Sequence, residues 1–201
     1  FILDDSPVHL PLSGKFNVYN ALAALAVGDS LGFATEKILD ALQKAHGVAG
    51  RLQRVEGSEN YSVLVDYAHT PDGLANVLTA VKEFSQGRII TVFGCGGDRD
   101  HSKRPKMGAI AAQMSHYCFV TSDNPRSEEA MAIINDILPG VVKEMTPEQY
   151  QIIEDRAAAI HAAIAMAQKG DVIVLAGKGH EDYQEINGVK HHFDDYEIAK
   201  E

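Results

Sequence analysis

The stretch from Arg88 to Gly108, RIITVFGCGGDRDHSKRPKMG, constrains the fold more than any other part of the chain. The β-branched and aromatic run up to Phe93 is typical of a buried strand, and it leads into a loop with glycine at 94, 96 and 97. Glycine allows positive φ and carries no Cβ, so N–H groups of such a loop can approach a ligand closely. We therefore expect a strand that delivers a ligand loop, which then presents charged side chains: Asp98, Arg99, Asp100, Lys103 and Arg104.

Two more polar loops follow predicted strands. TSDNPR, residues 121–126, ends the strand at 117–121, and GKGHEDY begins after the strand at 171–176. Loops at the carboxyl ends of strands in an open α/β sheet converge at one edge. We expect them to form one pocket from Arg99, Asp123, Asn124, Arg126, Gly177 and Glu181, with Pro125 setting the turn. For each charged residue alone, the alternative is an ordinary surface ion pair, contributing roughly 0 to 1 kcal/mol.

The expected pocket carries both signs of charge, which suits a zwitterion. Guanidinium groups bind a carboxylate with two parallel hydrogen bonds, while carboxylates and backbone carbonyls accept from an ammonium. These residue types therefore indicate a ligand that resembles an amino acid.

From Arg51 onward, strand and helix patterns alternate, which predicts an α/β, Rossmann-like domain with a largely parallel sheet and helices on both faces. The short glycine-bearing segment at 46–50 has no periodicity and marks a boundary between residues 1–49 and 50–201. Within the second part, Ser127 is expected to cap a helix that Pro139-Gly140 ends, and Asn187-Gly188 indicates a type I′ hairpin.

Charge and composition exclude some classes of function. The formal net charge of −10 argues against nucleic acid or an anionic membrane as a partner. The two cysteines, Cys95 and Cys118, have no metal-type spacing and indicate free thiols in a reducing compartment. No stretch has the length of a membrane span or the pattern of a signal peptide, so we expect a cytoplasmic protein. We also expect it to be a monomer. The chain begins at Phe1, in mid-pattern, which suggests a fragment.

The strings VFGCGGDRD, KRPKMG and TSDNPR together resemble the C-terminal domain of the Mur ligases, and DNPR resembles the members that add meso-diaminopimelate. FNVYNALAA is similar to the end of the family's central domain, and GRLQRV and DYAHTPD are similar to its nucleotide site. The resemblance covers essentially the whole chain. It implies that residues 1–49 end the central ATP-binding domain and that residues 50–201 are the amino-acid-binding ligase domain.

The resemblance implies an ATP-dependent amide ligase of peptidoglycan synthesis. ATP would phosphorylate the D-glutamyl γ-carboxylate of UDP-N-acetylmuramoyl-L-alanyl-D-glutamate, and meso-diaminopimelate would displace the phosphate, with Mg²⁺ offsetting phosphate charge. The family's P-loop, metal ligands and carbamylated lysine would precede Phe1. We therefore assign no catalytic residue and no metal site within this chain.

The same resemblance assigns two sets of binding residues. Meso-diaminopimelate would be held by Arg99, Asp123, Asn124, Pro125, Arg126, Gly177 and Glu181. Nucleotide would be contacted at adenine by Asn20, at the phosphates by Arg51, at the ribose by Asp66, and near the γ-phosphate by His69. On the residues alone, Asn20 also fits capping of a helix start, and His69 fits a turn histidine bonded to backbone. Departures from the family pattern at Ala130 and Tyr196 put the adjacent helix starts in doubt.

Two rival functions remain open. A lysine-adding ligase of the same family is the nearest, and Arg126 discriminates because the similar lysine enzymes lack it. A dinucleotide-binding dehydrogenase module fits the strand followed by GCGG, but it requires a full GxGxxG and an acidic residue at the end of the next strand, where Val120 and Thr121 stand.

We predict that this chain alone does not hydrolyse ATP. It contains no Gly-x-x-x-x-Gly-Lys-Ser/Thr sequence to surround the β and γ phosphates. A phosphate-release assay on the purified chain should stay at background. Release that disappears on mutating a residue of this chain would contradict the prediction.

Overall fold

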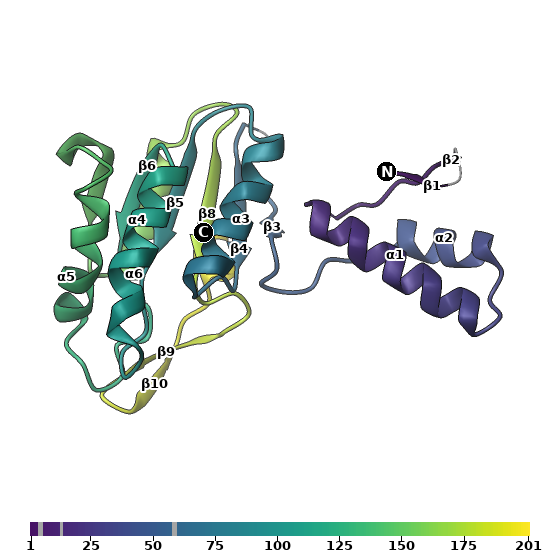
Figure 1. Ribbon diagram of the computed structural model, residues 1–201. Coiled ribbons are helices and arrows are strands. Elements are labelled where there is room, and N and C mark those ends of the chain that lie inside the picture. The colour runs from purple at the N-terminus through teal and green to yellow at the C-terminus, as the bar shows by residue number, and fades with distance from the viewer. Residues whose placement is uncertain (4–5, 13, 58–59) are drawn as a thin grey trace. The chain divides into compact units, whose positions relative to one another are not determined.

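The computed structural model describes residues 1–3, 6–12, 14–57 and 60–201, and the chain folds as two compact units, Phe1–Val48 and Ala49–Glu201. The first unit contains an antiparallel strand pair, β1 (Ile2–Leu3) and β2 (Ser6–Pro7), and two helices, α1 (Lys15–Ser30) and α2 (Thr35–Gln43) (Figure 1). After α1 the chain turns at Gly32, whose φ of 79° is in the left-handed region.

The second unit is built on a six-stranded sheet in the order β3-β4-β8-β5-β6-β7. Its strands are β3 (Gln53–Val55), β4 (Ser62–Asp66), β5 (Ile89–Phe93), β6 (Tyr117–Val120), β7 (Tyr150–Ile152) and β8 (Val172–Ala176). The edge strand β3 runs antiparallel to β4, and every other neighbouring pair is parallel. The prediction of a largely parallel α/β sheet is confirmed.

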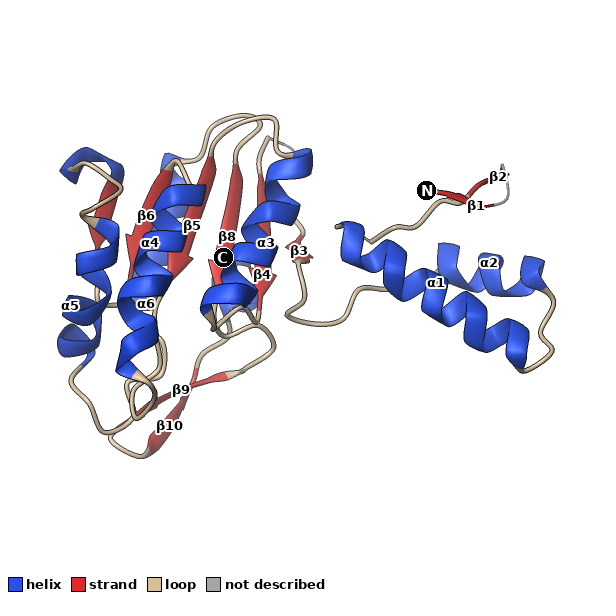
Figure 2. Cartoon of the chain, in the orientation of Figure 1, coloured by secondary structure: helices blue, strands red, loops and turns tan. Residues whose placement is uncertain are grey.

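Helices cover both faces of this sheet (Figure 2). The core on one face includes residues of α3 (Pro71–Phe84), α4 (Arg104–Met114) and α5 (Ala130–Val141), and the core on the other includes residues of α6 (Arg156–Met166) and α7 (Asp195–Lys200). Right-handed crossovers explain this division: the chain moves in one direction from β4 through β5 and β6 to β7, then reverses to reach β8. No helix among the described residues has the length and apolarity to cross a membrane.

The central strands β5 and β8 are buried at all of their positions. A parallel strand covered on both faces has no solvent-facing side, so it is apolar without alternation. This explains the continuous runs IITVF and VIVLA in the sequence. These two rigid neighbours set the positions of the loops that leave their carboxyl ends.

Helix α5 differs from the sequence prediction at both ends. The Ser127 hydroxyl contacts Asp98 Oδ1 at 2.6 Å and does not cap the helix, whose N-cap is Glu129. Pro139 lies inside the helix, which continues to Val141. The reason is tertiary: Ile137 and Val141 are fully buried, and a Cβ at Gly140 would clash with the Pro105 carbonyl of α4, so the last turn of α5 packs directly on the α4 backbone.

A hairpin lies beyond the carboxyl ends of the parallel strands (Figure 2). It consists of β9 (Tyr183–Ile186) and β10 (Val189–His192), and its turn has positive φ at both Asn187 and Gly188, 50° and 76°, as a type I′ turn requires. The hairpin is hydrogen-bonded to the loop after β6, residues 121–126, which we call the DNPR loop. Arg126 N donates to Glu185 O at 2.9 Å, and Asn187 N donates to Arg126 O at 2.6 Å.

We expect Gly140→Ala to lower the free energy of unfolding by about 1 to 3 kcal/mol, as overpacking of a closed interface does. Helix propensity alone would favour alanine by about 1 kcal/mol, so a loss of stability must come from the α4 contact. Asn135→Ala, on the exposed side of the same helix, is the control and should be neutral or slightly stabilising. Denaturant unfolding of both variants measures the difference; a stabilised Gly140→Ala would contradict this packing.

Candidate functional site

The loops after β5, β6 and β8 meet beyond the carboxyl edge of the sheet, where these three strands are neighbours. The loop after β8 touches the loop after β6 at Gly177: its φ is 122°, and a Cβ there would lie 2.5 Å from Asp123 Oδ2. The positive φ favours glycine at 177, and a Cβ there would also displace the Asp123 carboxylate.

The glycine-rich loop packs against the DNPR loop. Gly97 N donates to Asn124 O at 2.9 Å, and a Cβ at Gly97 would clash with the Pro125 carbonyl. Gly94 likewise leaves no room for a Cβ beside the Thr121 carbonyl. The positive φ expected here occurs not at these glycines but at Asp98, at 54°. Glycine is therefore needed at 94 and 97 because it has no Cβ. The close contact that it permits is between two loops of the protein itself.

Both arginines of the expected pocket flank Gly96. Arg126 has a φ of 54°, and its Nη1 donates to Gly97 O at 2.8 Å while its Nε lies 3.7 Å from Glu185 Oε2. A fifth of the Arg126 side chain is exposed, 20%. Arg99 is exposed, and its Nη1 donates to Asp98 O at 3.0 Å. Arg126 is thus oriented by its bond to Gly97 O, whereas Arg99 is bonded to its neighbour in the chain.

A compact polar cluster lies where the loops after β6 and β8 meet. Asn124 Nδ2 donates to Glu181 Oε2 at 2.8 Å, and Lys178 Nζ donates to Asn124 Oδ1 at 3.1 Å. Lys178 is fully buried, and this burial lowers the pKa of its ammonium group. The sequence assigned no role to Lys178; its signal was a lysine between two glycines at the end of a buried strand.

Arg104 was expected among the side chains that the glycine-rich loop presents, but it is fully buried and braces that loop from within. Its Nη2 donates to Glu128 Oε1 at 2.8 Å and its Nη1 to Asp136 Oδ2 at 2.8 Å. Glu128 Oε1 also accepts from Asp98 N at 2.6 Å. The hydrogen bond from Arg104 lowers the pKa of Glu128 to about 2, so this carboxylate stays ionised and keeps the loop tied to α4 and α5.

Three of the residues expected at the nucleotide lie close together: Arg51 before β3, Asp66 at the end of β4 and His69 shortly after it. The Arg51 guanidinium lies 5.1 Å from the centre of the Tyr67 ring, and the His69 ring packs edge-on against Tyr67 with centres 4.6 Å apart. His180, from the loop after β8, is the other ring beside Tyr67, at 5.2 Å. Arg51 and His69 therefore share one surface, centred on Tyr67, that the sequence did not single out.

Asp66 is buried beneath this surface, with both carboxylate oxygens bonded to backbone. Oδ2 accepts from Leu52 N at 2.8 Å and Oδ1 from Ala68 N at 2.9 Å, while burial raises the pKa of the group. His69 Nδ1 lies 2.8 Å from Tyr67 O, the arrangement of a turn histidine. Asn20 belongs to the first unit, where it is exposed and donates from Nδ2 to Asn17 Oδ1 at 3.1 Å.

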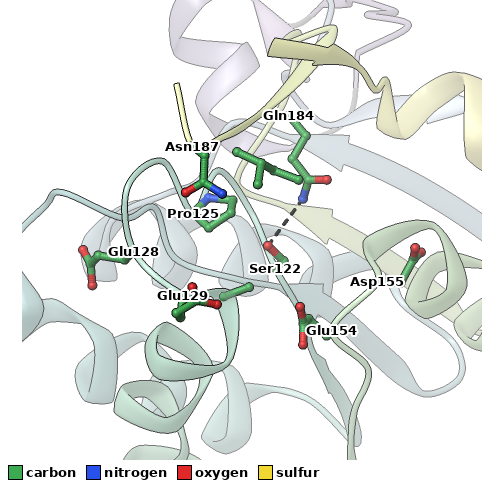
Figure 3. Close-up of a pocket in the computed structure, with 10 residues that line it drawn as sticks. Ser122, Pro125, Glu128, Glu129, Glu154, Asp155, Gln184 and Asn187 are labelled. Atoms are coloured by element: carbon green, nitrogen blue, oxygen red, sulfur yellow. Dashed lines mark hydrogen bonds between the residues drawn. The ribbon is translucent and has the colours of Figure 1, made fainter. Parts of the chain in front are cut away.

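A cavity of about 330 Å³ lies on the hairpin side of the DNPR loop (Figure 3). Gln184 bridges part of it by donating to Ser122 Oγ at 3.4 Å. Pro125 is the one residue of the expected amino-acid site that lines this cavity. The lining consists of Ser122, Pro125, Glu128, Glu129, Ala130, Glu154, Asp155, Gln184, Ile186 and Asn187. This cavity is therefore not the expected pocket, which stays a prediction.

Comparison with known proteins decides the family. The family model described as the glutamate ligase domain of the Mur ligases matches residues 50–179. The chain belongs to the Mur ligase family. The match includes the loops after β5 and β6 and the first three residues of the loop after β8, up to 179; Glu181 and the hairpin lie beyond it.

Two similar relatives and one similar solved structure carry the same protein name. The chain is 52% identical over 194 residues to UDP-N-acetylmuramoyl-L-alanyl-D-glutamate--2,6-diaminopimelate ligase of Clostridioides difficile (strain 630), covering 96% of this chain and 40% of that protein. It is 50% identical to the protein of the same name in Bacillus cereus (strain ATCC 14579), with 96% and 39% covered. A solved structure of a ligase with this name superposes with a TM-score of 0.75 at 43% identity, over 96% of this chain and 39% of the other. The chain spans about two fifths of the length of these relatives.

We expect Glu128→Gln to destabilise this Mur ligase domain by about 1.5 to 3 kcal/mol at pH 7, the range for a hydrogen bond to a charged group. Because the folded pKa of Glu128 is below 4.5, its ionised form stabilises the fold fully above pH 4.5, and this contribution is lost as the pH falls toward 2. Unfolding measured from pH 7 to pH 2 should therefore show a flatter acid limb in the variant. Glu83→Gln, at an exposed position of α3, is the control; equal curves for Glu128→Gln and wild type would contradict the brace.

Proposed function

We propose that this chain is the amino-acid-binding part of an ATP-dependent ligase that adds meso-diaminopimelate to UDP-N-acetylmuramoyl-L-alanyl-D-glutamate. In that reaction ATP converts the D-glutamyl γ-carboxylate to an acyl phosphate, and an amino group of meso-diaminopimelate displaces phosphate. The observation that carries the proposal is the identity of about half of the residues, 52% and 50%, to relatives named for this reaction.

The proposed site for meso-diaminopimelate is the edge where the loops after β5, β6 and β8 meet. Arg126 would bind the distal carboxylate, since its guanidinium is already oriented by the bond to Gly97 O and by a left-handed backbone. Glu181 and the Gly177 carbonyl would accept from the adjacent ammonium, and Arg99 would anchor the other end. The full proposed set is Arg99, Asp123, Asn124, Pro125, Arg126, Gly177 and Glu181.

The proposed nucleotide contacts are Asn20, Arg51, Asp66 and His69. The surface around Tyr67 supports this assignment because Arg51 and His69 lie on it together. Asp66, whose two oxygens already accept backbone N–H groups, would serve the ribose indirectly by holding the backbone at Leu52, beside Arg51, close to that at Ala68, beside His69. Mg²⁺ would accompany ATP in such a ligase. Among the residues that the structure describes, no three His, Cys, Asp or Glu side chains are grouped to hold a metal ion.

A dinucleotide-binding dehydrogenase is a poorer account of the same loops. Its phosphate-binding turn requires free backbone N–H groups next to the ligand. Here the Gly97 N–H group already donates a hydrogen bond to Asn124 O, and Gly94 and Gly97 pack against the DNPR loop. A lysine-adding ligase remains the rival that experiment must separate.

Arg126→Ala in a full-length ligase containing this chain should lower kcat/KM for meso-diaminopimelate by about 30-fold to several thousand-fold, corresponding to about 2 to 5 kcal/mol for one partner of a desolvated charge pair. Lysine has no distal carboxylate, so its use should change much less. Steady-state kinetics with both amino acids measures the ratio. Arg126→Lys should recover only part of the loss, because an ammonium lacks the two-pronged geometry.

The matched control is Arg54→Ala, which removes an exposed arginine from the edge strand β3 and should leave both substrates unaffected. An unchanged ratio of kcat/KM for meso-diaminopimelate over lysine in Arg126→Ala would show that another element sets selectivity. A wild-type enzyme that prefers lysine would instead refute the proposed substrate.

A further inference from the structure

The Lys178 side chain is fully buried, although the residue lies at the start of a loop beyond the edge of the sheet. Its Nζ lies 5.6 Å from the centre of the Tyr183 ring and 5.8 Å from that of Phe193. An ammonium group has three N–H donors and no acceptor, and burying it is unfavourable unless those donors find partners. The partners of Lys178 therefore show what the buried charge does.

Those partners are two side chains of the proposed amino-acid site. Lys178 Nζ lies 3.1 Å from Asn124 Oδ1 and 3.6 Å from Glu181 Oε2. Asn124 Nδ2 in turn lies 2.8 Å from the same Glu181 oxygen. The three side chains form a closed triangle that joins the loop after β6 to the loop after β8.

The orientation of the Asn124 amide follows from an independent contact. Glu185 N donates to Asn124 Oδ1 at 2.9 Å, and a backbone N–H can only donate. Oδ1 must therefore face Glu185 and Lys178, which leaves the amide nitrogen facing Glu181. Lys178 and the hairpin backbone together saturate Oδ1, so the Asn124 amide has one orientation.

Charge balance also requires the lysine. Asp123 and Glu181 attract the Lys178 ammonium from the two loops, Asp195 attracts it from α7, and Arg156 of α6 repels it. Asp123 is only 7% exposed, so water screens these carboxylates weakly. Without the lysine, Glu181 would lose the cation that lies 3.6 Å from its Oε2, and the contact between the loops would loosen.

We propose that Lys178 is a positioning residue, which ties Asn124 and Glu181 together from the buried side and so holds the Glu181 carboxylate in place for the ammonium group of the incoming diamino acid. Lys178 does not touch that substrate; it acts through Asn124 and Glu181. The identity of the substrate rests on the proposed function, whereas the triangle of contacts does not.

The test is Lys178→Met, which keeps an unbranched apolar side chain between the two rings and removes the ammonium. In the full-length ligase, KM for the diamino acid should rise about 10- to 100-fold, the effect of losing hydrogen bonds to a charged group. KM for ATP should stay within about twofold, and kcat should fall less than KM rises. Lys190→Met is the matched control, because Lys190 also lies over the Tyr183 ring, at 3.8 Å, but on the exposed strand β10; it should leave every constant unchanged.

A double-mutant cycle separates positioning from general destabilisation. Because Lys178 and Asn124 hold the same Glu181 carboxylate, Lys178→Met added to Asn124→Ala should raise KM by a clearly smaller factor than Lys178→Met does in the wild type. Effects that multiply, or an equal rise in KM for ATP, overturn the proposal. Should the wild-type enzyme use lysine in place of meso-diaminopimelate, the proposed substrate fails, and the same cycle run with lysine still decides the role of Lys178.

A measurement without substrate tests the contact between Lys178 and Asn124 independently of catalysis. In this chain, the Asn124 side-chain amide should exchange with solvent at least about 10-fold faster in Lys178→Met than in wild type or Lys190→Met, as followed by nitrogen-15 NMR. Equal exchange rates would mean that Lys178 does not hold Asn124, and the proposal would be wrong whatever the enzyme's substrate.

Discussion

The close contact between the loop after β5 and the loop after β6 is the constraint on which the rest of the site depends. Gly94 and Gly97 lie where a Cβ would clash with the backbone of 121–125, so the two loops meet main chain to main chain. That contact places Arg126 next to Gly97 O, and the β9–β10 hairpin then binds the Arg126 backbone from the other side. A residue held from two directions can have a left-handed φ and an oriented guanidinium at once, which a free loop would not maintain.

Buried arginines brace these loops from inside the domain. Arg156 and Asp195 are both fully buried, with Nη2 to Oδ2 at 2.6 Å, and Arg156 Nη2 also donates to Ala176 O, the last residue of β8. The pair therefore connects α6 and α7 to the start of the loop that carries Gly177 and Lys178. Removing one partner would leave an uncompensated buried charge, which costs about 3 to 5 kcal/mol. Two buried nitrogens, Arg104 Nε and Arg156 Nη1, have no hydrogen-bond partner among the described residues, so orienting these guanidinium groups carries a cost in desolvation.

Local sequence patterns predicted the hairpin and the central strands, but they misplaced both ends of α5, the helix that packs on α4. The hairpin at Asn187-Gly188 follows from the backbone preference of two residues, and β5 and β8 follow from continuous apolar runs. Helix α5 could not be bounded in the same way. The local tendency of Pro139 to end a helix was outweighed by burial of Ile137 and Val141 and by the Gly140 contact with α4, none of which is visible in a window of neighbouring residues.

What the sequence by itself determined was the class of fold, the family and the loops that carry the polar residues, because strand runs, glycine spacing and motif strings are local properties of the chain. Only the tertiary structure decided what those residues do. It turned Arg104 inward to Glu128 and Asp136, bonded both oxygens of Asp66 to backbone, and made Lys178 the centre of a cluster with Asn124 and Glu181. The physical reason is that the order β4-β8-β5-β6 brings together loops separated by dozens of residues, and the burial and partners of a charged side chain depend on those neighbours.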